Sequence, residues 1–219
     1  MRPAVSAAVH GTPQVARVYN RVARFYDLYD APMDWLGGAK RRKRVLRRAG
    51  GRVLEVGIGT GRNLPHYDPD VQLCGIDIAD AMLARARDRA TNSVALVTLL
   101  QGDVERLPFP CETFDAVTAT CVFCSVPDPI AGLREVARVV RPDGQVLLLE
   151  HVRPRNAVLG FVSDLLSPIT RRLLGPSINR RTEANVTSAG LEIVELHRSG
   201  VWREIRAVPA SGAERAPTS

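Results

Sequence analysis

An apolar strand that runs directly into a glycine-rich turn constrains this chain more than any other feature. Residues 53–62 read Val-Leu-Glu-Val-Gly-Ile-Gly-Thr-Gly-Arg, and the next apolar segment ends in an acid, Asp77, twenty positions after Gly57. Glycines let the backbone turn tightly and approach a ligand where a Cβ would clash. An acid at the tip of the following strand can accept both hydroxyls of a ribose. The pattern therefore predicts a nucleoside-binding edge on a parallel sheet.

Strand-like and helix-like segments alternate after this turn. The strand-like segments are residues 52–56, 72–77, 95–101, 114–120 and 145–150, followed by a closing hairpin of residues 191–196 and 201–208. Helices are expected at residues 80–90, with Asp80 as the N-cap, and at residues 130–140. Such alternation predicts an α/β fold with a doubly wound, mostly parallel sheet.

The segment before the sheet, residues 12–49, reads as helical. Apolar side chains recur there at spacings of three and four, at Val15, Val18, Val22, Phe25 and Tyr29. We expect Pro32 to interrupt the helix and Gly50-Gly51 to end its second half. At 219 residues the chain is long enough for one domain with a full core.

The spacing of the glycines separates this turn from other phosphate-binding turns. Gly57, Gly59 and Gly61 form Gly-x-Gly-x-Gly, whereas the dinucleotide fingerprint places its third glycine one position later. A P-loop would carry Gly-Lys-Ser/Thr, which this stretch lacks. The stretch resembles motif I of the class I S-adenosylmethionine (SAM) methyltransferases.

Further segments carry the same resemblance, which runs from about residue 19 to residue 208. They are Gln101-Gly102-Asp103-Val104, Leu107-Pro108-Phe109, Phe114-Asp115-Ala116-Val117 and the helix-turn-strand of residues 133–149. The resemblance implies a Rossmann-like class I methyltransferase fold with strand order 3-2-1-4-5-7-6, the seventh strand being antiparallel. Residues 1–50 would form an N-terminal helical cap, 51–208 the SAM-binding domain with a substrate-lid insert at 151–190, and 209–219 a disordered tail.

The resemblance also implies SAM as the cofactor, S-adenosyl-L-homocysteine as the product, and a set of cofactor-binding residues. Gly57, Gly59 and Gly61 would flank the methionine part of SAM, and Glu55 would hold the turn and reach towards the amino group, directly or through water. Asp77 would bind the ribose hydroxyls, and Ile78 and Met82 would pack on the adenine. Asp103 and the Val104 amide would bind the adenine edge, and Thr120 would lie where cofactor and substrate meet.

Three residues are candidates for a catalytic role. Tyr19 and Tyr26 are seven positions apart and so are expected to share a helix face. Their segment resembles the N-terminal helix that covers SAM in quinone and phospholipid methyltransferases, although ordinary amphipathic packing would explain it equally well. His151, at the end of the fifth strand, is either a general base or a hydrogen-bonded structural histidine.

The net charge of +7 favours acidic partners. Its densest cluster, residues 40–44, is either a solvated helix face or part of a binding patch. The fourth strand ends in Thr-Cys-Val-Phe-Cys-Ser-Val, not in the Asp/Asn-Pro-Pro-Tyr of amino-base methyltransferases, so no specific nucleic-acid partner is expected. Cys121 and Cys124 lack the second pair that zinc requires, so no metal is expected. They are interpreted as packing residues, with a redox role as the alternative.

The chain has no apolar run near the ~20 residues that span a bilayer, and its start lacks the apolar core of a signal peptide. We therefore expect a cytoplasmic protein, with peripheral contact to the inner face of an anionic membrane as an option. Residues 158–174 are apolar at helical spacing with arginines at one end, which suits either an interfacial segment or a lid over an apolar pocket.

Residues 121–126, 149–152 and 179–182 resemble bacterial phosphatidylethanolamine N-methyltransferase-like proteins and alkyl thiol methyltransferases. Leu-Pro-Phe and Phe-Asp-Ala-Val resemble ubiquinone/menaquinone C-methyltransferases equally well. The first hypothesis is a methyltransferase acting on a lipid-like or small apolar acceptor, a phospholipid amine ahead of a quinone or a thiol. The alternatives are a non-catalytic SAM- or membrane-binding module, and an RNA methyltransferase, which only the charge suggests.

Overall fold

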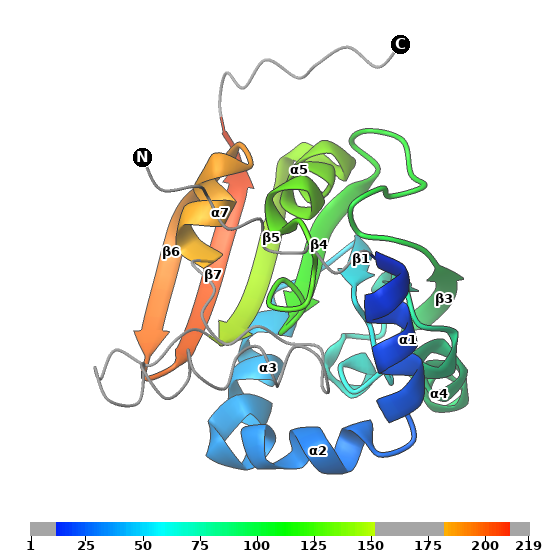
Figure 1. The fold of residues 1–219 in the computed structure, drawn as a ribbon. Coiled ribbons are helices and arrows are strands. Elements are labelled where there is room, and N and C mark those ends of the chain that lie inside the picture. The colour runs from blue at the N-terminus through cyan, green and yellow to red at the C-terminus, as the bar shows by residue number, and fades with distance from the viewer. Residues whose placement is uncertain (1–11, 152–181, 211–219) are drawn as a thin grey trace, which may run out of the picture.

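The structure is a computed structural model that describes residues 12–151 and 182–210. A single seven-stranded sheet has the order β3-β2-β1-β4-β5-β7-β6, with helices on both faces (Figure 1). The strands are β1 (Arg52–Val56), β2 (Gln72–Asp77), β3 (Leu96–Gln101), β4 (Phe114–Thr120), β5 (Val140–His151), β6 (Leu191–Ser199) and β7 (Trp202–Pro209). Only β7 runs antiparallel to its neighbours β5 and β6, and β1 to β5 are parallel. The predicted fold class and strand order are confirmed.

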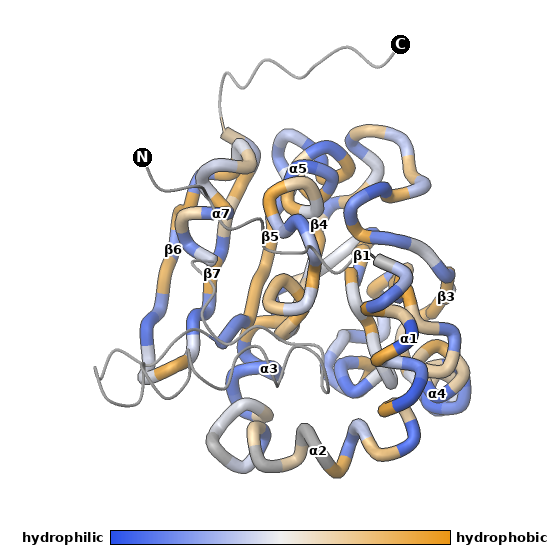
Figure 2. The backbone as a smooth tube through the Cα atoms, viewed as in Figure 1, coloured by the Kyte–Doolittle hydropathy of each residue, from blue (hydrophilic) through white to orange (hydrophobic). Residues whose placement is uncertain are grey.

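The central strands are apolar on both faces, because helices cover each face (Figure 2). Since successive side chains alternate across a strand, Leu54 and Val56 of β1 join one core and Val53 joins the other. The first core packs against α5 (Pro129–Val139) and α7 (Thr182–Ser188). The second packs against α3 (Ala39–Leu46) and α4 (Asp80–Ala90). Both faces of the sheet are thus covered by packed helices.

The N-terminal segment is divided at a different place from the one predicted. α1 (Thr12–Val22) ends before a turn at residues 23–25, and α2 (Tyr26–Met33) contains Pro32 and leads into a π-helical turn, η1 (Asp34–Gly38). The turn forms where Ala23, only 3% exposed, packs against the start of α4. Phe25 was predicted to lie on the packed face, but it is 62% exposed because it follows this turn.

Capping of α4 also differs from the prediction. Asp80 is the first helical residue, not the N-cap, and its side chain lies 3.7 Å from Arg87 on the surface. The N–H groups at the helix start are bonded by others: Asp77 Oδ1 accepts from Ala79 N at 2.9 Å, and Asn20 Oδ1 of α1 accepts from Ala81 N at 2.9 Å. The start of α4 is therefore stabilised jointly by Asn20 of α1 and Asp77 of β2.

β5 begins at Val140, earlier than predicted, because Val140 already pairs with Phe114 of β4. The predicted lid lies largely outside the described residues, as do the segment 158–174 and the tail beyond residue 210. Within the described ranges, no helix has the length and apolar character needed to cross a membrane.

Candidate cofactor and acceptor site

A cleft lies at the carboxyl ends of β1, β2 and β4, beneath α1 and the start of α2. It encloses about 720 Å³ of empty space, including the part open to solvent. Ten of the thirteen predicted site residues line it: Tyr19, Tyr26, Gly57, Gly59, Asp77, Ile78, Met82, Asp103, Val104 and Thr120. The structure thus gathers side chains that are up to about 100 positions apart in the sequence.

The Asp77 carboxylate shapes the glycine loop. Its Oδ2 accepts a hydrogen bond from Gly59 N at 2.8 Å, while Oδ1 accepts from Ala79 N. Desolvation raises the pKa of this carboxyl, and the backbone hydrogen bonds oppose the shift. Gly59 has φ +58°, and a Cβ on it would enter open space in the cleft. Because each carboxylate oxygen has two lone pairs, Asp77 keeps acceptor capacity for a ligand hydroxyl.

The wall beyond β2 and β3 combines apolar side chains with one acid. Asp103 forms a tight turn in which its Oδ1 accepts from Glu105 N at 2.9 Å. Val104 follows it, and Ile78 and Met82 lie across from it on the loop and start of α4. This wall thus combines apolar side chains with a carboxylate acceptor, which suits a heterocyclic base.

The two cap tyrosines meet at the cleft, although they do not share a helix. Tyr19 is in α1 and Tyr26 begins α2, so the turn between the helices brings their rings to 6.0 Å at an interplanar angle of 59°. The hydroxyl of Tyr19 lies 2.6 Å from Ser125 Oγ in the loop after β4. The expectation of one helix face was wrong, but both rings line the cleft.

The loop after β4 is fixed from below by Glu150 of β5. Its Oε1 accepts from the backbone N–H groups of Val122 and Phe123, both at 3.0 Å. Cys121 has φ +56°, an uncommon conformation for a non-glycine residue, and lines the cleft. Cys124 is buried with its Sγ 3.3 Å from Cys121 O. No cluster of three or more potential metal ligands occurs in the part of the chain that the structure describes.

Three predicted site residues do not line the cleft. Glu55 is 1% exposed and lies beneath the glycine loop, where Oε1 accepts from Asn63 Nδ2 at 2.5 Å and Oε2 from Tyr67 OH at 3.0 Å. Burial raises its pKa to about 7, although these bonds oppose the shift. The carboxyl is bound by two core side chains and does not line the cleft, so it supports the turn from below.

Gly61 and His151 are also placed away from the cleft lining. Gly61 has φ +79°, and a Cβ on it would meet Ala86 Cα at 3.2 Å, so this glycine lets the loop pack on α4. His151 is partly buried and lies opposite Trp202 of β7. Desolvation lowers the pKa of its imidazole.

The sequence did not predict a polar branch of the cleft, whose basic side chains are Arg42 and Arg62. This branch shares Tyr26, Gly57, Gly59, Thr120 and Cys121 with the main cleft. Arg42 is 7% exposed, and its Nη1 donates to Asn63 Oδ1 at 2.8 Å and to Thr120 Oγ1 at 2.9 Å.

A sequence signal for Arg42 exists. The buried residues of α3 are Arg42, Val45 and Leu46, which are i, i+3 and i+4 on one helix face. The basic run at residues 40–44 is therefore not entirely a solvated face.

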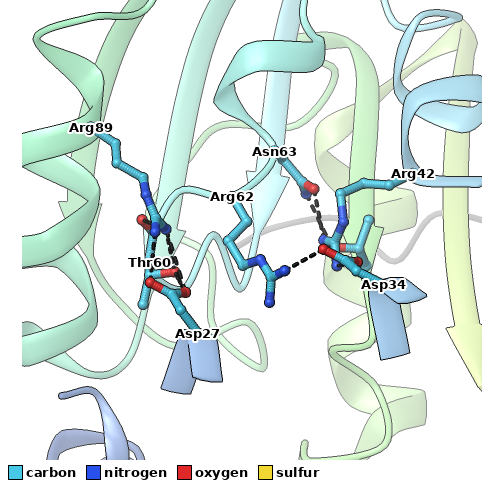
Figure 3. A network of polar contacts seen from close by, with 8 residues as sticks. Asp27, Asp34, Arg42, Thr60, Arg62, Asn63 and Arg89 are labelled. Carbon is cyan, nitrogen blue, oxygen red and sulfur yellow. Dashed lines mark hydrogen bonds and ion pairs between the residues drawn. The ribbon is translucent and has the colours of Figure 1, made fainter. Parts of the chain in front are cut away.

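Two acids of the cap bind this same loop, as Figure 3 shows. Asp27 accepts from Arg89 Nη2 at 2.6 Å and from Thr60 Oγ1 at 2.7 Å. Burial would raise the pKa of Asp27, but its bonds to Arg89 and Thr60 outweigh burial and lower it. Asp34 pairs with Arg62 and lies 3.5 Å from Arg42 Nη2. The cap is thus attached to the glycine loop by charged contacts at two places, Asp27 and Asp34.

Comparison with known proteins agrees with this geometry. The methyltransferase domain family matches residues 54–148. A phosphatidylethanolamine N-methyltransferase of Cereibacter sphaeroides is 36% identical over 83% of this chain and 89% of its own length. A ubiquinone/menaquinone biosynthesis C-methyltransferase of Pseudomonas fluorescens is 35% identical over 78% of this chain and 71% of its own length.

The fold has solved counterparts. The crystal structure of a SAM-dependent methyltransferase from Thermotoga maritima superposes with a TM-score of 0.68 at 21% identity, over 88% of this chain and 99% of that one. This likeness supports the fold alone, whereas the two relatives above 30% identity support kinship. The chain belongs to the class I SAM-dependent methyltransferases.

Proposed function

We propose that this methyltransferase acts on a lipid-like acceptor, with a phospholipid amine as the first candidate. The observation that carries this proposal is the 36% identity, over 83% of the chain, to a phosphatidylethanolamine N-methyltransferase. The apolar part of the cleft supports it, because Val15, Val122 and Val126 also line the cleft. A quinone acceptor is the alternative, favoured by the 35% identity to a C-methyltransferase of quinone biosynthesis.

The residues of the cleft fit SAM. Asp77 would accept the ribose hydroxyls, Ile78 and Met82 would contact the adenine, and Asp103 with the Val104 amide would bind its edge. The polar branch suits the other end of the molecule, because the guanidinium groups of Arg42 and Arg62 match a carboxylate.

When bound, SAM supplies an electrophilic methyl group on a positively charged sulfur. The chain's own contribution is to align the acceptor and to exclude water, and alignment alone can contribute ~7–11 kcal/mol. Tyr19 and Tyr26 roof the cleft, and Gly57 and Gly59 form its floor. An amine that arrives neutral needs no dedicated base. The hydroxyls of Tyr19 and Ser125, which lie 2.6 Å apart, would accept a hydrogen bond from such an amine.

Three of the arginines around α3 are not available to a nucleic acid, although Lys40 and Lys43 of the same helix are exposed. Arg44 pairs with Glu204, Arg48 pairs with Glu195 at 2.7 Å, and Arg42 is turned inward. Cations that are engaged with protein acids contribute little to phosphate binding. We therefore infer no specific nucleic-acid partner, and any RNA affinity should vanish at moderate salt.

The acceptor is tested by incubating the purified protein with methyl-labelled SAM and, separately, with phosphatidylethanolamine vesicles, quinones and alkyl thiols. Label in the phospholipid fraction is the expected result, and Asp77→Ala is the control without cofactor binding. Label only in the quinone or thiol samples would overturn the acceptor. SAM binding by calorimetry with no transfer to any component of a whole-cell extract would contradict the proposed activity.

A further inference from the structure

We propose that the outer side of the N-terminal cap is a docking surface for an anionic phospholipid bilayer. We call this surface the cap patch and define it by Phe25, Leu28 and Trp35, whose exposed fractions are 62%, 76% and 95%. An almost fully exposed tryptophan is uncommon on a protein that has nothing to bind. This proposal rests on the proposed function, because a lipid acceptor explains why the protein would dock on a bilayer. The exposure and charge of the cap residues are observed independently of the acceptor.

Two acids of the cap face the protein body, beside inward-packed apolar side chains such as Val22 and Met33. Asp27 binds Arg89 and Thr60, and Asp34 binds Arg62, so both carboxylates are used inward. Leu28 and Trp35, each one position further along the chain, face solvent. An ordinary surface helix would place these side chains the other way round. The two ion-paired contacts therefore hold the apolar side chains outward.

Charge around the cap patch complements an anionic surface. Arg21, Arg24, Lys40 and Lys43 are exposed, and within the described ranges none of them forms an ion pair with an acid. The guanidinium of Arg24 lies 5.6 Å from the centre of the Phe25 ring, so a cation and an apolar ring are adjacent. Aromatic and leucine side chains flanked by lysine and arginine are the composition that binds the interface of anionic lipids.

The position of the cap patch fits a lipid substrate. The cleft lies at the carboxyl ends of β1, β2 and β4, and α2 lies at the same end of the molecule in Figure 1. Tyr26 lines the cleft from the first position of α2, while Leu28 two positions later faces solvent. A bilayer seated on the cap patch would thus be close to the cleft, which shortens the path of a lipid headgroup to the methyl group.

Vesicle sedimentation of the full chain is the direct test. We expect binding to vesicles of phosphatidylethanolamine with phosphatidylglycerol, weak binding to phosphatidylcholine vesicles, and loss of binding as salt rises. Leu28→Ser with Trp35→Ser should weaken binding about tenfold or more, since two large apolar side chains no longer insert. Val94→Ser with Leu96→Ser is the matched control, because these exposed side chains, at 65% and 72%, lie beside or within the edge strand β3.

Tryptophan fluorescence gives a second readout that does not depend on activity. The chain has two tryptophans, and Trp202 is 4% exposed, so Trp202→Phe leaves Trp35 as the only reporter. Anionic vesicles should shift its emission to the blue, and brominated lipids should quench it. Unshifted emission, or equal vesicle binding by the Leu28/Trp35 variant, would overturn the proposal. The proposal would also be overturned if the wild type bound no vesicles but formed a concentration-dependent dimer that the Leu28/Trp35 variant did not form.

The failure of this proposal can be told from the failure of the proposed function. Calorimetric SAM binding and methyl transfer to a short-chain, water-soluble phosphatidylethanolamine should be unchanged in the Leu28/Trp35 variant. If the wild type binds vesicles but methylates only a quinone or thiol, the docking surface stands and the acceptor falls. If the wild type methylates the short-chain lipid but binds no vesicles, the lipid acceptor stands and the docking surface falls.

Discussion

Two polar networks meet at the glycine loop, and they differ in burial. The inner network joins Glu55, Asn63, Tyr67 and Thr118 beneath the loop, and each of these residues is at most 2% exposed. The outer network joins the cap to the same loop, and its side chains are more exposed: 29% for Asp27, 21% for Asp34, 19% for Arg62 and 39% for Arg89. One network lies inside the protein core, and the other fastens a separate layer onto it.

This difference predicts which property each network controls. Buried polar groups interact strongly and are costly to leave unpaired, so the inner network should govern the free energy of unfolding. Partly exposed ion pairs are weakened by water and salt, so the outer network should mainly govern how the cap closes over a ligand. Stability and ligand affinity should therefore respond to different substitutions.

Asp77→Ala should have the largest effect, because this carboxylate holds the loop on which both networks act. The change leaves the N–H groups of Gly59 and Ala79 without their acceptor and removes the proposed ribose contact. Losing two hydrogen bonds to a charged group predicts SAM affinity that is weaker by about 100-fold or more. Calorimetry measures it, with Asp77→Asn as an intermediate control that keeps one oxygen. Unchanged affinity in Asp77→Ala would show that the loop needs no support from this side chain.

Local patterns explain why Asp77 and the fold were predictable from the sequence. The sheet order, the glycine turn and the acid at the end of β2 all arise from short segments whose residue types allow few conformations. The ends of α1 and α2 were not predictable in the same way. The packing of Ala23 on α4 decides where the chain turns, and that contact joins residues distant in sequence.

Partners that only the folded chain brings together explain the contacts that were not predicted at the site. Glu55 has the motif position of a ligand-facing acid, but Asn63 and Tyr67 follow it in the chain and bind its carboxyl first. Arg42 lies in a run of bases that looks solvated, yet Thr120 of β4 and Asn63 accept its hydrogen bonds. Such pairings depend on tertiary structure, which a single sequence does not show.

Glu55→Gln tests the inner network through pH. The folded pKa of about 7 lies above the ordinary value of 4.5, so the folded state prefers the protonated carboxyl. The stability contributed by this preference is complete below the unfolded pKa and is lost as pH rises through the folded pKa. Between about pH 5 and about pH 8, the wild type should lose roughly 2–3 kcal/mol more than Glu55→Gln.

Urea unfolding at the two pH values measures this difference. Histidines whose pKa is lowered, such as His66, are present in both proteins, so the comparison isolates Glu55. Parallel pH dependence in the two proteins would mean that the Glu55 carboxyl is ionised in the fold.

Gly61→Ala tests whether the loop can be destabilised without touching either network. A Cβ at φ +79° is strained and would press on Leu64 and on Ala86 of α4, so a loss of roughly 2 kcal/mol is expected. Gly50→Ala is the matched control, because a Cβ there meets nothing within 4 Å and no positive φ is required. Equal melting temperatures for the two variants would contradict the packing role of Gly61.

Asp34→Asn weakens the outer network and should leave the fold nearly intact. We expect a stability loss of at most about 1 kcal/mol and roughly fivefold weaker SAM binding, because Arg62 and Arg42 lose the charge that positions them. The difference in affinity should shrink at high salt. Asp80→Asn removes a comparable but solvent-exposed pair with Arg87 and should change neither quantity. A large fall in melting temperature for Asp34→Asn would place this residue with the inner network instead.

His151→Gln should have the smallest effect, because His151 belongs to neither network. It pairs with Trp202 at the end of β5, it does not line the cleft, and desolvation lowers its pKa so that the imidazole is neutral near pH 7. SAM binding should be unchanged, and kcat should stay within about twofold of the wild type, a change of less than about 0.5 kcal/mol. The measurement is kcat against pH for both proteins. If the variant loses turnover while keeping SAM affinity, and the acidic limb of its pH profile disappears, then His151 reaches the acceptor as a general base and the cleft extends further along β5 than its described lining.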